Sequence, residues 1–367
     1  MAPSPERPGG VPVTRSNWAL VRTVGGLGIL ALLLCLLGTG PFLDGLRLID
    51  GWALAVALGI GALTTVCCAW RWSLVSGGLG VRLPLGTAVA HCYRAVFLNS
   101  TLPGGVLGDV HRAVRHGRDA GDVGRGIRAV VWERTAGQVV QAGIALAVLF
   151  AFPSPVRSYL PAATGLVLAG GLGAVLLVRA VSRSGHARWA QALRTTRADV
   201  HDGLLAHGKW LGVLLASTVV VAGHLATFLV AARTAGATAP LSQLVPLTFL
   251  ALLAMGVPAN VAGFGPREGV AAWAFGAAGL TAAQGIATAM VYGALVLVAS
   301  LPGAAVLLIA VRHGSTKEND GRGTARRDGS DPGHGAVAVP RRIRHDRAGV
   351  LLRRLGGRSG ASRLRTR

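Results

Sequence analysis

Charged residues are scarce in this sequence. Only 14% of its 367 residues are Asp, Glu, Lys or Arg, whereas 51% are hydrophobic, and the mean hydropathy is +0.52. A soluble domain contains about 25% charged residues, so this composition argues against a soluble fold. Apolar runs of about 20 residues recur along the chain, and a helix of that length crosses the ~30 Å hydrocarbon core of a bilayer. The composition therefore predicts an all-α polytopic membrane protein.

Acidic residues and lysine are scarcer still. The chain has 15 Asp and Glu against 37 Lys and Arg, nearly all of them arginine, and its formal net charge is +22. Such a charge also occurs in nucleic-acid-binding proteins. Here, however, the arginines lie in loops and in the tail beside apolar segments, as in the cytoplasmic parts of membrane proteins. We therefore expect no nucleic-acid partner. The richness in Arg, Ala, Gly and Val indicates a GC-rich bacterial genome as the source.

Residues that catalyse reactions or bind metal ions are also few. The chain has four cysteines, all in apolar stretches and none in a C-x-x-C pair, so we expect them to pack as small hydrophobic residues. His111 and His116 are five positions apart and do not share a helical face, which makes them poor metal ligands. The sequence has neither the G-K-[ST] end of a P-loop nor a G-x-S-x-G elbow. We therefore expect no metal, no cofactor and no enzymatic activity.

Six apolar runs are long enough to cross a membrane once, and the basic segments between them set the orientation. The runs lie at about 24–43, 52–70, 129–151, 160–181, 210–233 and 286–311. Cytoplasmic loops of membrane proteins carry an excess of Arg and Lys. This rule places the N-terminus, the C-terminus and the segments 71–84, 109–128 and 182–209 in the cytoplasm.

The apolar stretch 85–107 has a basic, cytoplasmic segment on both sides, so it cannot cross the membrane once. We predict that it forms a re-entrant hairpin, with Pro103 and neighbouring glycines at its bend. Irregular backbone at membrane depth is tolerated only where it is buried in protein or lines water. The bend is therefore a candidate place for a polar site.

A second interruption lies in 244–283, at the motif GFGPREG. This stretch is either a second hairpin or two further crossings, because both bring the basic tail to the cytoplasm. The chain then has six full spans plus two re-entrant or broken hairpins, or about eight crossings plus one hairpin. Both versions remain open from the sequence alone.

The first version divides the membrane domain, residues 23–312, into two similar units at 24–151 and 160–311. Each unit has an odd number of crossings, so the two insert with opposite orientation, as in the inverted repeats of many transporters. The alternative is that the two breaks are unrelated glycine-rich kinks. The polar N-terminus, residues 1–22, and the basic tail, residues 313–367, are expected to be disordered in the cytoplasm.

Acidic and basic residues occur together at or near both breaks. Three sets are present: Asp109 with Arg112, Glu133 with Arg134, and Arg267 with Glu268. A charged residue at the centre of a spanning helix costs on the order of 2.5–3.5 kcal/mol on insertion scales, so such sets point to a functional site. For Glu133 and Arg134 the alternative is a place at the cytoplasmic rim, where they would cost little.

Arginine suits phosphate oxygens because its planar guanidinium presents several donors in a fixed fork. We predict that four arginines together bind a phosphate headgroup and that the acids hold them in place. Arg134, Gln138 and Gln141 share one helical face by their spacing. The candidate substrate-binding residues are Arg94, Asn99, Asp109, Arg112, Glu133, Arg134, Asn260, Arg267 and Glu268.

Three motifs resemble, in order and spacing, the lysylphosphatidylglycerol synthase transmembrane (flippase-like) family. They read NSTLPGGVLGDVHR, WERTAG and GFGPREG…GLTAAQGIATA, and the resemblance covers about residues 20–312. It implies a multi-pass protein of the bacterial inner (plasma) membrane, related to the lipid-flipping half of the multiple-peptide-resistance enzymes. Those enzymes add an aminoacyl-transferase domain that we do not find in this sequence. We therefore expect lipid translocation and no aminoacylation.

Two functions remain as hypotheses. The first is a lipid translocase that moves an anionic phospholipid or a polyprenyl-phosphate-linked lipid across the bacterial plasma membrane. The second is a non-transporting membrane partner of a separate glycosyl- or acyl-transferase in cell-envelope lipid synthesis. A membrane-embedded enzyme with Asp109 or Glu133 as its base is a third class, but no nucleophile or metal set accompanies these acids.

Overall fold

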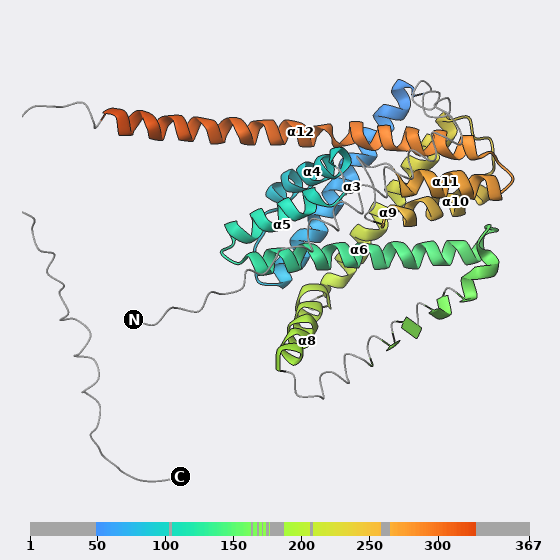
Figure 1. The fold of residues 1–367 in the computed structure, drawn as a ribbon, viewed down its shortest axis with the longest axis horizontal. Helices are drawn as coiled ribbons and strands as arrows, with labels where there is room; N and C mark the ends of the chain where they lie inside the picture. The colour runs from blue at the N-terminus through green and yellow to red at the C-terminus, as the bar shows by residue number, and fades with distance from the viewer. Residues whose placement is uncertain are drawn as a thin grey trace, which may run out of the picture. The chain divides into compact units, whose positions relative to one another are not determined.

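A computed structural model describes residues 49–327, except 103–104, parts of 163–186, 206–207 and 258–264. The described residues form helices and contain no strand (Figure 1). The predicted span 24–43, the predicted disorder at 1–22 and Asn260 lie outside the described residues, as does half of the predicted span 160–181. Residues 1–313 and 314–367 separate into two units by their contacts, and the architecture below is that of the first unit.

Four helices are long and apolar enough to cross a membrane. They are α3 (Gly51–Gly78), α6 (Val123–Ala151), α9 (Lys209–Thr234) and the first part of α12 (Ala282–Arg327), of which Ala282–Leu308 is apolar. They coincide with four of the six predicted spans and confirm the all-helical, polytopic membrane character. The boundary predicted for one of them was wrong, because α3 continues past Arg71 to Gly78.

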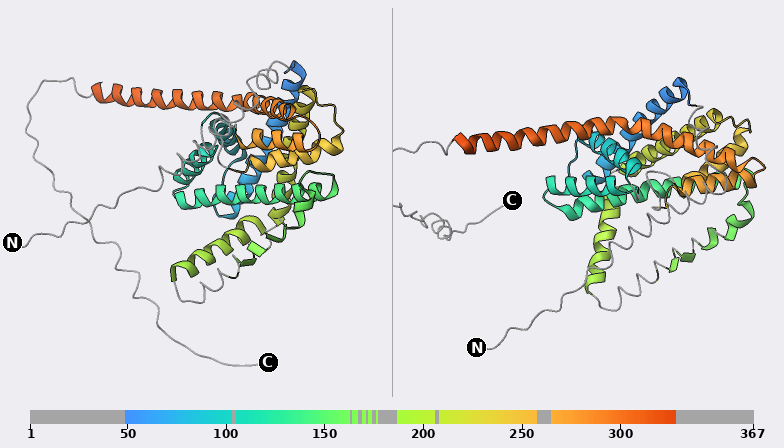
Figure 2. Two further views of the ribbon diagram at one scale, coloured as in Figure 1. Left: turned by 45° about the vertical axis from the view of Figure 1, so that its right-hand side comes forward. Right: turned by 45° about the horizontal axis from the view of Figure 1, so that its top comes forward.

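Four shorter helices lie between the long ones in two pairs. The first pair is α4 (Leu85–Thr101) and α5 (Leu107–Asp119), and the second is α10 (Leu241–Ala254) and α11 (Pro266–Ala277). At 1.5 Å per residue these helices are about 18–26 Å long, which is less than the ~30 Å of a hydrocarbon core. Within each pair, the two helices lie side by side in every view (Figure 2). The remaining described helices are η1 (Arg157–Tyr159), α8 (Ala187–Val200) and η2 (His201–Leu205).

The order long, short, short, long occurs twice, in α3–α6 and in α9–α12, and the packing repeats with it. The long helices α3 and α9 pack along each other. α6 packs on α10, and α12 approaches α4, where a Cβ on Gly303 would collide with the Tyr93 carbonyl. α5 packs on α6 where Gly126 meets Gly117, and α12 meets α11 at Gly285 and Ala271. Glycine at these points lets two helix backbones approach closely, which is how helices associate in lipid.

Candidate functional site

A cavity of about 300 Å³ lies where the two groups of four helices meet. Its walls come from every long helix and from α4, α5, α10 and α11. Five of the predicted site residues line it: Asn99, Arg112, Glu133, Arg134 and Arg267. Gln138 and Gln141 also line it, so the helical face predicted from the spacing of Arg134, Gln138 and Gln141 does face the cavity.

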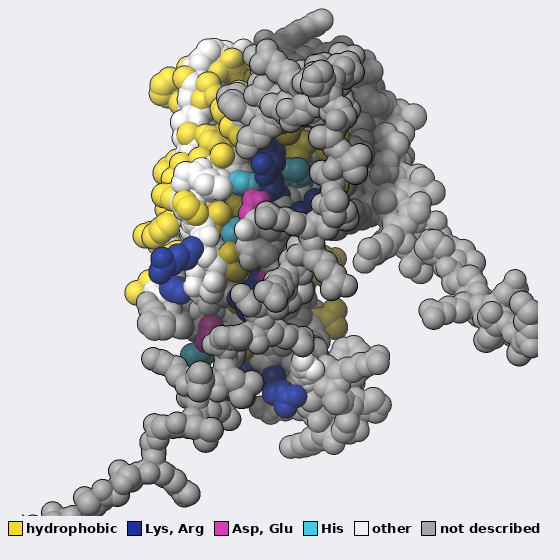
Figure 3. All heavy atoms as spheres, turned by 90° about the vertical axis from the view of Figure 1, so that its left-hand side faces the viewer, with side chains coloured by type: hydrophobic (Ala, Val, Ile, Leu, Met, Phe, Trp, Pro, Cys, Tyr) yellow, Lys and Arg dark blue, Asp and Glu magenta, His cyan; other side chains and the backbone are white. Residues whose placement is uncertain are grey.

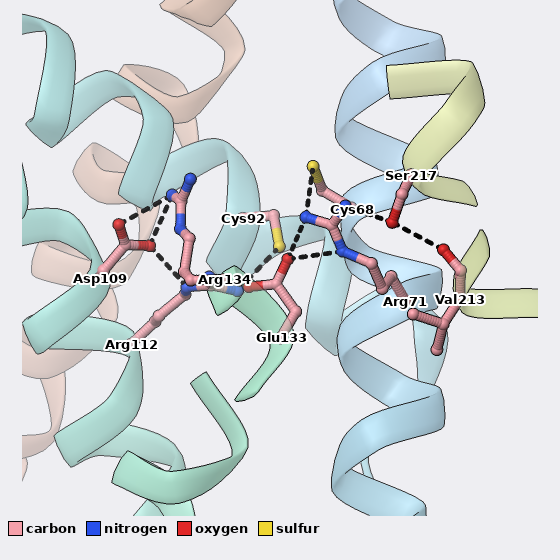
Figure 4. A network of polar contacts seen from close by, with 9 residues as sticks. All are labelled: Cys68, Arg71, Cys92, Asp109, Arg112, Glu133, Arg134, Val213 and Ser217. Atoms are coloured by element: carbon pink, nitrogen blue, oxygen red, sulfur yellow. Dashed lines mark hydrogen bonds and ion pairs between the residues drawn. The ribbon is translucent and has the colours of Figure 1, made fainter. Parts of the chain in front are cut away.

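Glu133 is the centre of a network of ion pairs (Figure 4). Its Oε1 accepts hydrogen bonds from Arg71 Nε at 3.0 Å and from Arg71 Nη2 at 2.5 Å. Its Oε2 accepts a hydrogen bond from Arg112 Nη2 at 2.6 Å. The Glu133 side chain is 1% exposed, and both arginines are buried as well. Glu133 therefore lies inside the helix bundle and not at an exposed rim.

The network continues through Asp109 to Arg134. Arg112 Nε donates to Asp109 Oδ1 at 2.9 Å, and Arg134 Nη2 lies 2.8 Å from both Asp109 oxygens. Charges of opposite sign thus alternate along five side chains from three helices. The arginines number three and the acids two, so with all five ionised the network carries one net positive charge. The last arginine, Arg134, is 44% exposed, on the cavity wall.

The two charged neighbours Glu133 and Arg134 do not pair with each other. Glu133 and Arg134 are neighbours in sequence, but Glu133 pairs with Arg71 and Arg112, and Arg134 pairs with Asp109. The two side chains leave α6 in directions about 100° apart, and here each of them meets partners on other helices. Their partners come from α3 and α5, and the two charges therefore join three helices.

Asn99 holds the two arms of the α4–α5 pair together at the bend. Its Nδ2 donates to Asp109 Oδ2 at 3.1 Å, and its Oδ1 accepts from the backbone N–H of Gly108 at 2.7 Å. A Cβ on Gly108 would collide with the backbone of Ala95, so only glycine allows this approach of α5 to α4. Asn99 thereby orients the carboxylate that binds Arg112 and Arg134.

Polar groups of neighbouring helices satisfy the remaining donors of the buried arginines. Arg71 Nη1 donates to Ser217 Oγ at 2.9 Å, and the Ser217 hydroxyl donates to the Val213 carbonyl at 2.6 Å. Ser217 lies on α9, so this bond ties the network to the second group of helices. Arg112 Nη1 lies 3.7 Å from Cys92 Sγ, a weak acceptor.

The second charged set, Arg267 with Glu268, lies at the start of α11. The Arg267 guanidinium pairs with the Glu268 carboxylate, which also accepts the backbone N–H of Gly265 at 2.7 Å and so caps the helix. Glu268 is fully buried. The guanidinium carbon of Arg267 is 5.0 Å from the ring centroid of Tyr292, whose hydroxyl is 2.9 Å from His224 Nδ1. Arg267 thus meets the cavity from the opposite group of helices.

Sequence reasoning missed Arg71 as a site residue. It was placed in a cytoplasmic loop because the apolar run was ended at the first charge. The signal that could have found it is the continuation of the helix, since the residues after Arg71 remain mostly apolar as far as Gly78. An arginine inside an apolar helix raises the free energy of membrane insertion, so it needs a buried acid as its partner.

Four predicted site residues do not line the described cavity, although two of them, Asp109 and Glu268, pair with arginines that do. Asn260 lies outside the described residues. Arg94 is buried on α4, but the cavity lining does not include it, and neither does it pair with a described acid. The structure therefore brings together three of the four predicted arginines, adds Arg71, and places Arg94 elsewhere.

The fold and the cavity define a polytopic helical membrane protein with a buried ion-pair network at its centre. The model of the family described as Lysylphosphatidylglycerol synthase TM region matches residues 21–303. The chain belongs to this family, and the family suggested by the three sequence motifs is confirmed. A search of curated proteins and a search of solved structures returned no match.

Proposed function

We propose that this protein is a lipid translocase that moves an anionic phospholipid or a polyprenyl-phosphate-linked lipid across the bacterial plasma membrane. The observation that carries the proposal is the single uncompensated positive charge of the buried network, presented to the cavity by Arg134. The headgroup enters the cavity while the acyl chains stay in the bilayer. Membership of a family described by a lipid synthase membrane region supports a lipid as the ligand.

The charge balance favours a group with one negative charge. Arg267 and Glu268 neutralise each other on the far wall, and Glu133 is shared by two buried arginines. The remaining pair, Asp109 with Arg134, leaves the cation exposed and the acid largely covered, at 44% and 14% of their side chains. A phosphodiester carries one charge and accepts the paired donors of a guanidinium. It would neutralise the network that it contacts.

We further propose that α4–α5 and α10–α11 are re-entrant pairs in two inverted repeats. Each of the four helices is shorter than a bilayer core, so each pair enters and leaves on one side. The repeated order of helices and the reciprocal packing of α6 on α10 and α12 on α4 support this arrangement. The cavity then lies near the middle of the membrane, between the two breaks, as in many transporters.

The test is headgroup movement in liposomes that contain the full chain and a fluorescent acyl-labelled phosphatidylglycerol. Dithionite added outside quenches only the label in the outer leaflet. The rate of further quenching therefore reports the transfer of labelled lipid from the inner to the outer leaflet. Arg134→Gln removes the exposed cation and should slow transfer at least tenfold, because hydrogen bonds to a charged group contribute about 1.5–3 kcal/mol. A lipid with the same labelled acyl chains and a zwitterionic headgroup serves as the reference substrate.

Arg125→Gln is the matched control. Arg125 lies on the same helix and is 49% exposed, but its partner is Asp122 at the helix start, far along α6 from Arg134. This variant should transfer lipid at the wild-type rate. Wild-type transfer by a folded Arg134→Gln protein would refute the site. Absence of transfer by the wild type, together with a transferase that copurifies with it, would favour the alternative of a non-transporting partner.

A further inference from the structure

The open end of the α4–α5 pair contains a second group of basic residues outside the cavity. Contacts between the two helices run antiparallel, from Asn99 with Gly108 at the bend to Cys92 with Arg112 further along. His91 and Arg94 lie on α4, and His111, Arg115 and His116 lie on α5. We call these five residues the hairpin cluster. Figure 3 shows histidine, basic and acidic side chains gathered on the face at this side of the molecule.

Trp72 of α3 separates the hairpin cluster from the central network. Its ring centroid is 6.1 Å from that of His91 and 5.2 Å from that of His116, and both rings pack edge-on against it. The guanidinium of Arg112 covers the same ring at 4.8 Å from its centroid. Trp72 is fully buried. One aromatic side chain therefore has the cavity network on one side and the hairpin cluster next to it.

Four polar atoms here are buried and lack a hydrogen-bond partner in the described part of the chain. They are Trp72 Nε1, His91 Nδ1, Arg94 Nε and His116 Nε2. Each residue is at least nine-tenths buried. Tryptophan and arginine nitrogens can only donate, and either histidine nitrogen donates when it carries a proton. Buried polar groups are almost always paired, so these four atoms call for a partner, and for Trp72 and Arg94 that partner must be an acceptor.

The charges in the hairpin cluster also favour an anionic ligand. Among the neighbouring charges, Arg115 has the strongest electrostatic effect on Arg94. Both arginines also act electrostatically on His91 and His111. No described acid forms an ion pair with Arg94 or Arg115. The nearby acid is Asp119, which acts on both buried histidines. A buried arginine beside a second arginine is unfavourable unless an anion joins them.

We propose that the hairpin cluster is a second anion-binding site, separate from the central cavity, and that its ligand is a phosphate group. A tetrahedral phosphate offers several acceptor oxygens and negative charge to donors that come from different helices. The phosphate is either a free inorganic ion or the headgroup of a lipid, since the recognition chemistry is the same. The proposal concerns a site that the translocation mechanism above does not use, so either can fail alone.

The experiment is calorimetric titration of the full chain in a non-ionic detergent with two probes. One is inorganic phosphate and the other is dihexanoyl phosphatidic acid below its critical micelle concentration. Arg94→Gln should weaken binding at least tenfold, and Trp72→Phe, which keeps the ring but removes the donor, about threefold, as expected for loss of a charged and a neutral hydrogen bond. Arg118→Gln and Arg125→Gln should stay within twofold of the wild type.

These controls separate the hairpin cluster from general charge effects. Arg118 lies on the same helix as Arg115 and is exposed, and Arg125 is an exposed arginine near the start of α6 that pairs with Asp122. Binding of one or both probes supports the site where Arg94→Gln weakens that binding, and it identifies the source of phosphate. Binding of neither probe overturns it, as does binding that Arg134→Gln abolishes and Arg94→Gln leaves unchanged. If Arg94→Gln elutes as an aggregate, wild-type affinity of Trp72→Phe overturns it as well.

Discussion

Replacement of Glu133 by glutamine tests whether the central network holds the helices together. The carboxylate accepts three hydrogen bonds from two arginines that are 4% and 3% exposed. Glutamine has the same shape, but its amide NH2 faces an arginine donor whichever way the amide is turned. Removal of one partner from a buried ion pair costs about 3–5 kcal/mol, because the other charge stays buried without compensation. In Glu133→Gln, Arg71 would have no acidic partner among the described residues, whereas Arg112 would keep Asp109.

The free energy of unfolding can be measured by titrating the detergent-solubilised protein with sodium dodecyl sulfate and following helicity. We expect Glu133→Gln to lose about 3–5 kcal/mol. Asp122→Asn is the matched control, since Asp122 lies on the surface and pairs with an exposed arginine. Asparagine also keeps the cap at the start of α6. The control should lose no more than about 1 kcal/mol.

A double-mutant cycle with Arg71→Met identifies the origin of the loss. Arg71→Met removes the cation that Glu133→Gln leaves without an acidic partner, so the double variant should be more stable than the sum of the single losses predicts. The coupling should lie in the range of about 0.5–3 kcal/mol found for contacting residues. A Glu133→Gln protein within 1 kcal/mol of its control, or a cycle without coupling, would refute the assignment of the network as structural.

Further predictions concern the bend and the opposite wall, and the same unfolding titration checks each of them. Gly108→Ala should destabilise the protein by about 1–3 kcal/mol, because its Cβ meets backbone, whereas Gly143→Ala has open space and should be neutral or stabilising. Asn99→Ala should cost about 1–3 kcal/mol, since it leaves the backbone N–H of Gly108 without its acceptor. Tyr292→Phe should cost about 1–3 kcal/mol by orphaning His224, and an unchanged stability would exclude that hydrogen bond.

Hydrophobicity and charge along the chain were sufficient to predict the helical architecture. Apolar runs and basic loops indicated four long helices that the structure describes, and proline and glycine indicated where helices break. These signals are local, since each depends on the composition of one segment. The end of α3 was missed for the same reason, because a single arginine was read as the edge of the apolar run.

The pairing of charges could not be predicted from the sequence. It depends on which helices are neighbours and on their rotation, and these are set by contacts between residues far apart in the chain. Glu133 is 62 residues from Arg71 and 21 residues from Arg112. Arg94 shows the same limit, since it is in the predicted hairpin and yet lies outside the cavity lining. The sequence could supply the residue types of the site but not their partners.

The contact between α5 and α6 is close at Gly126 and Gly117, where no side chains lie between the two backbones. Apolar packing and the ion pairs of Glu133 both act on the part of α6 that follows this contact. A turn of one residue, about 100°, would carry Glu133 away from both of its arginines at once. The ion pairs therefore oppose rotation of this helix about its axis, and they help to fix the direction in which Arg134, Gln138 and Gln141 face.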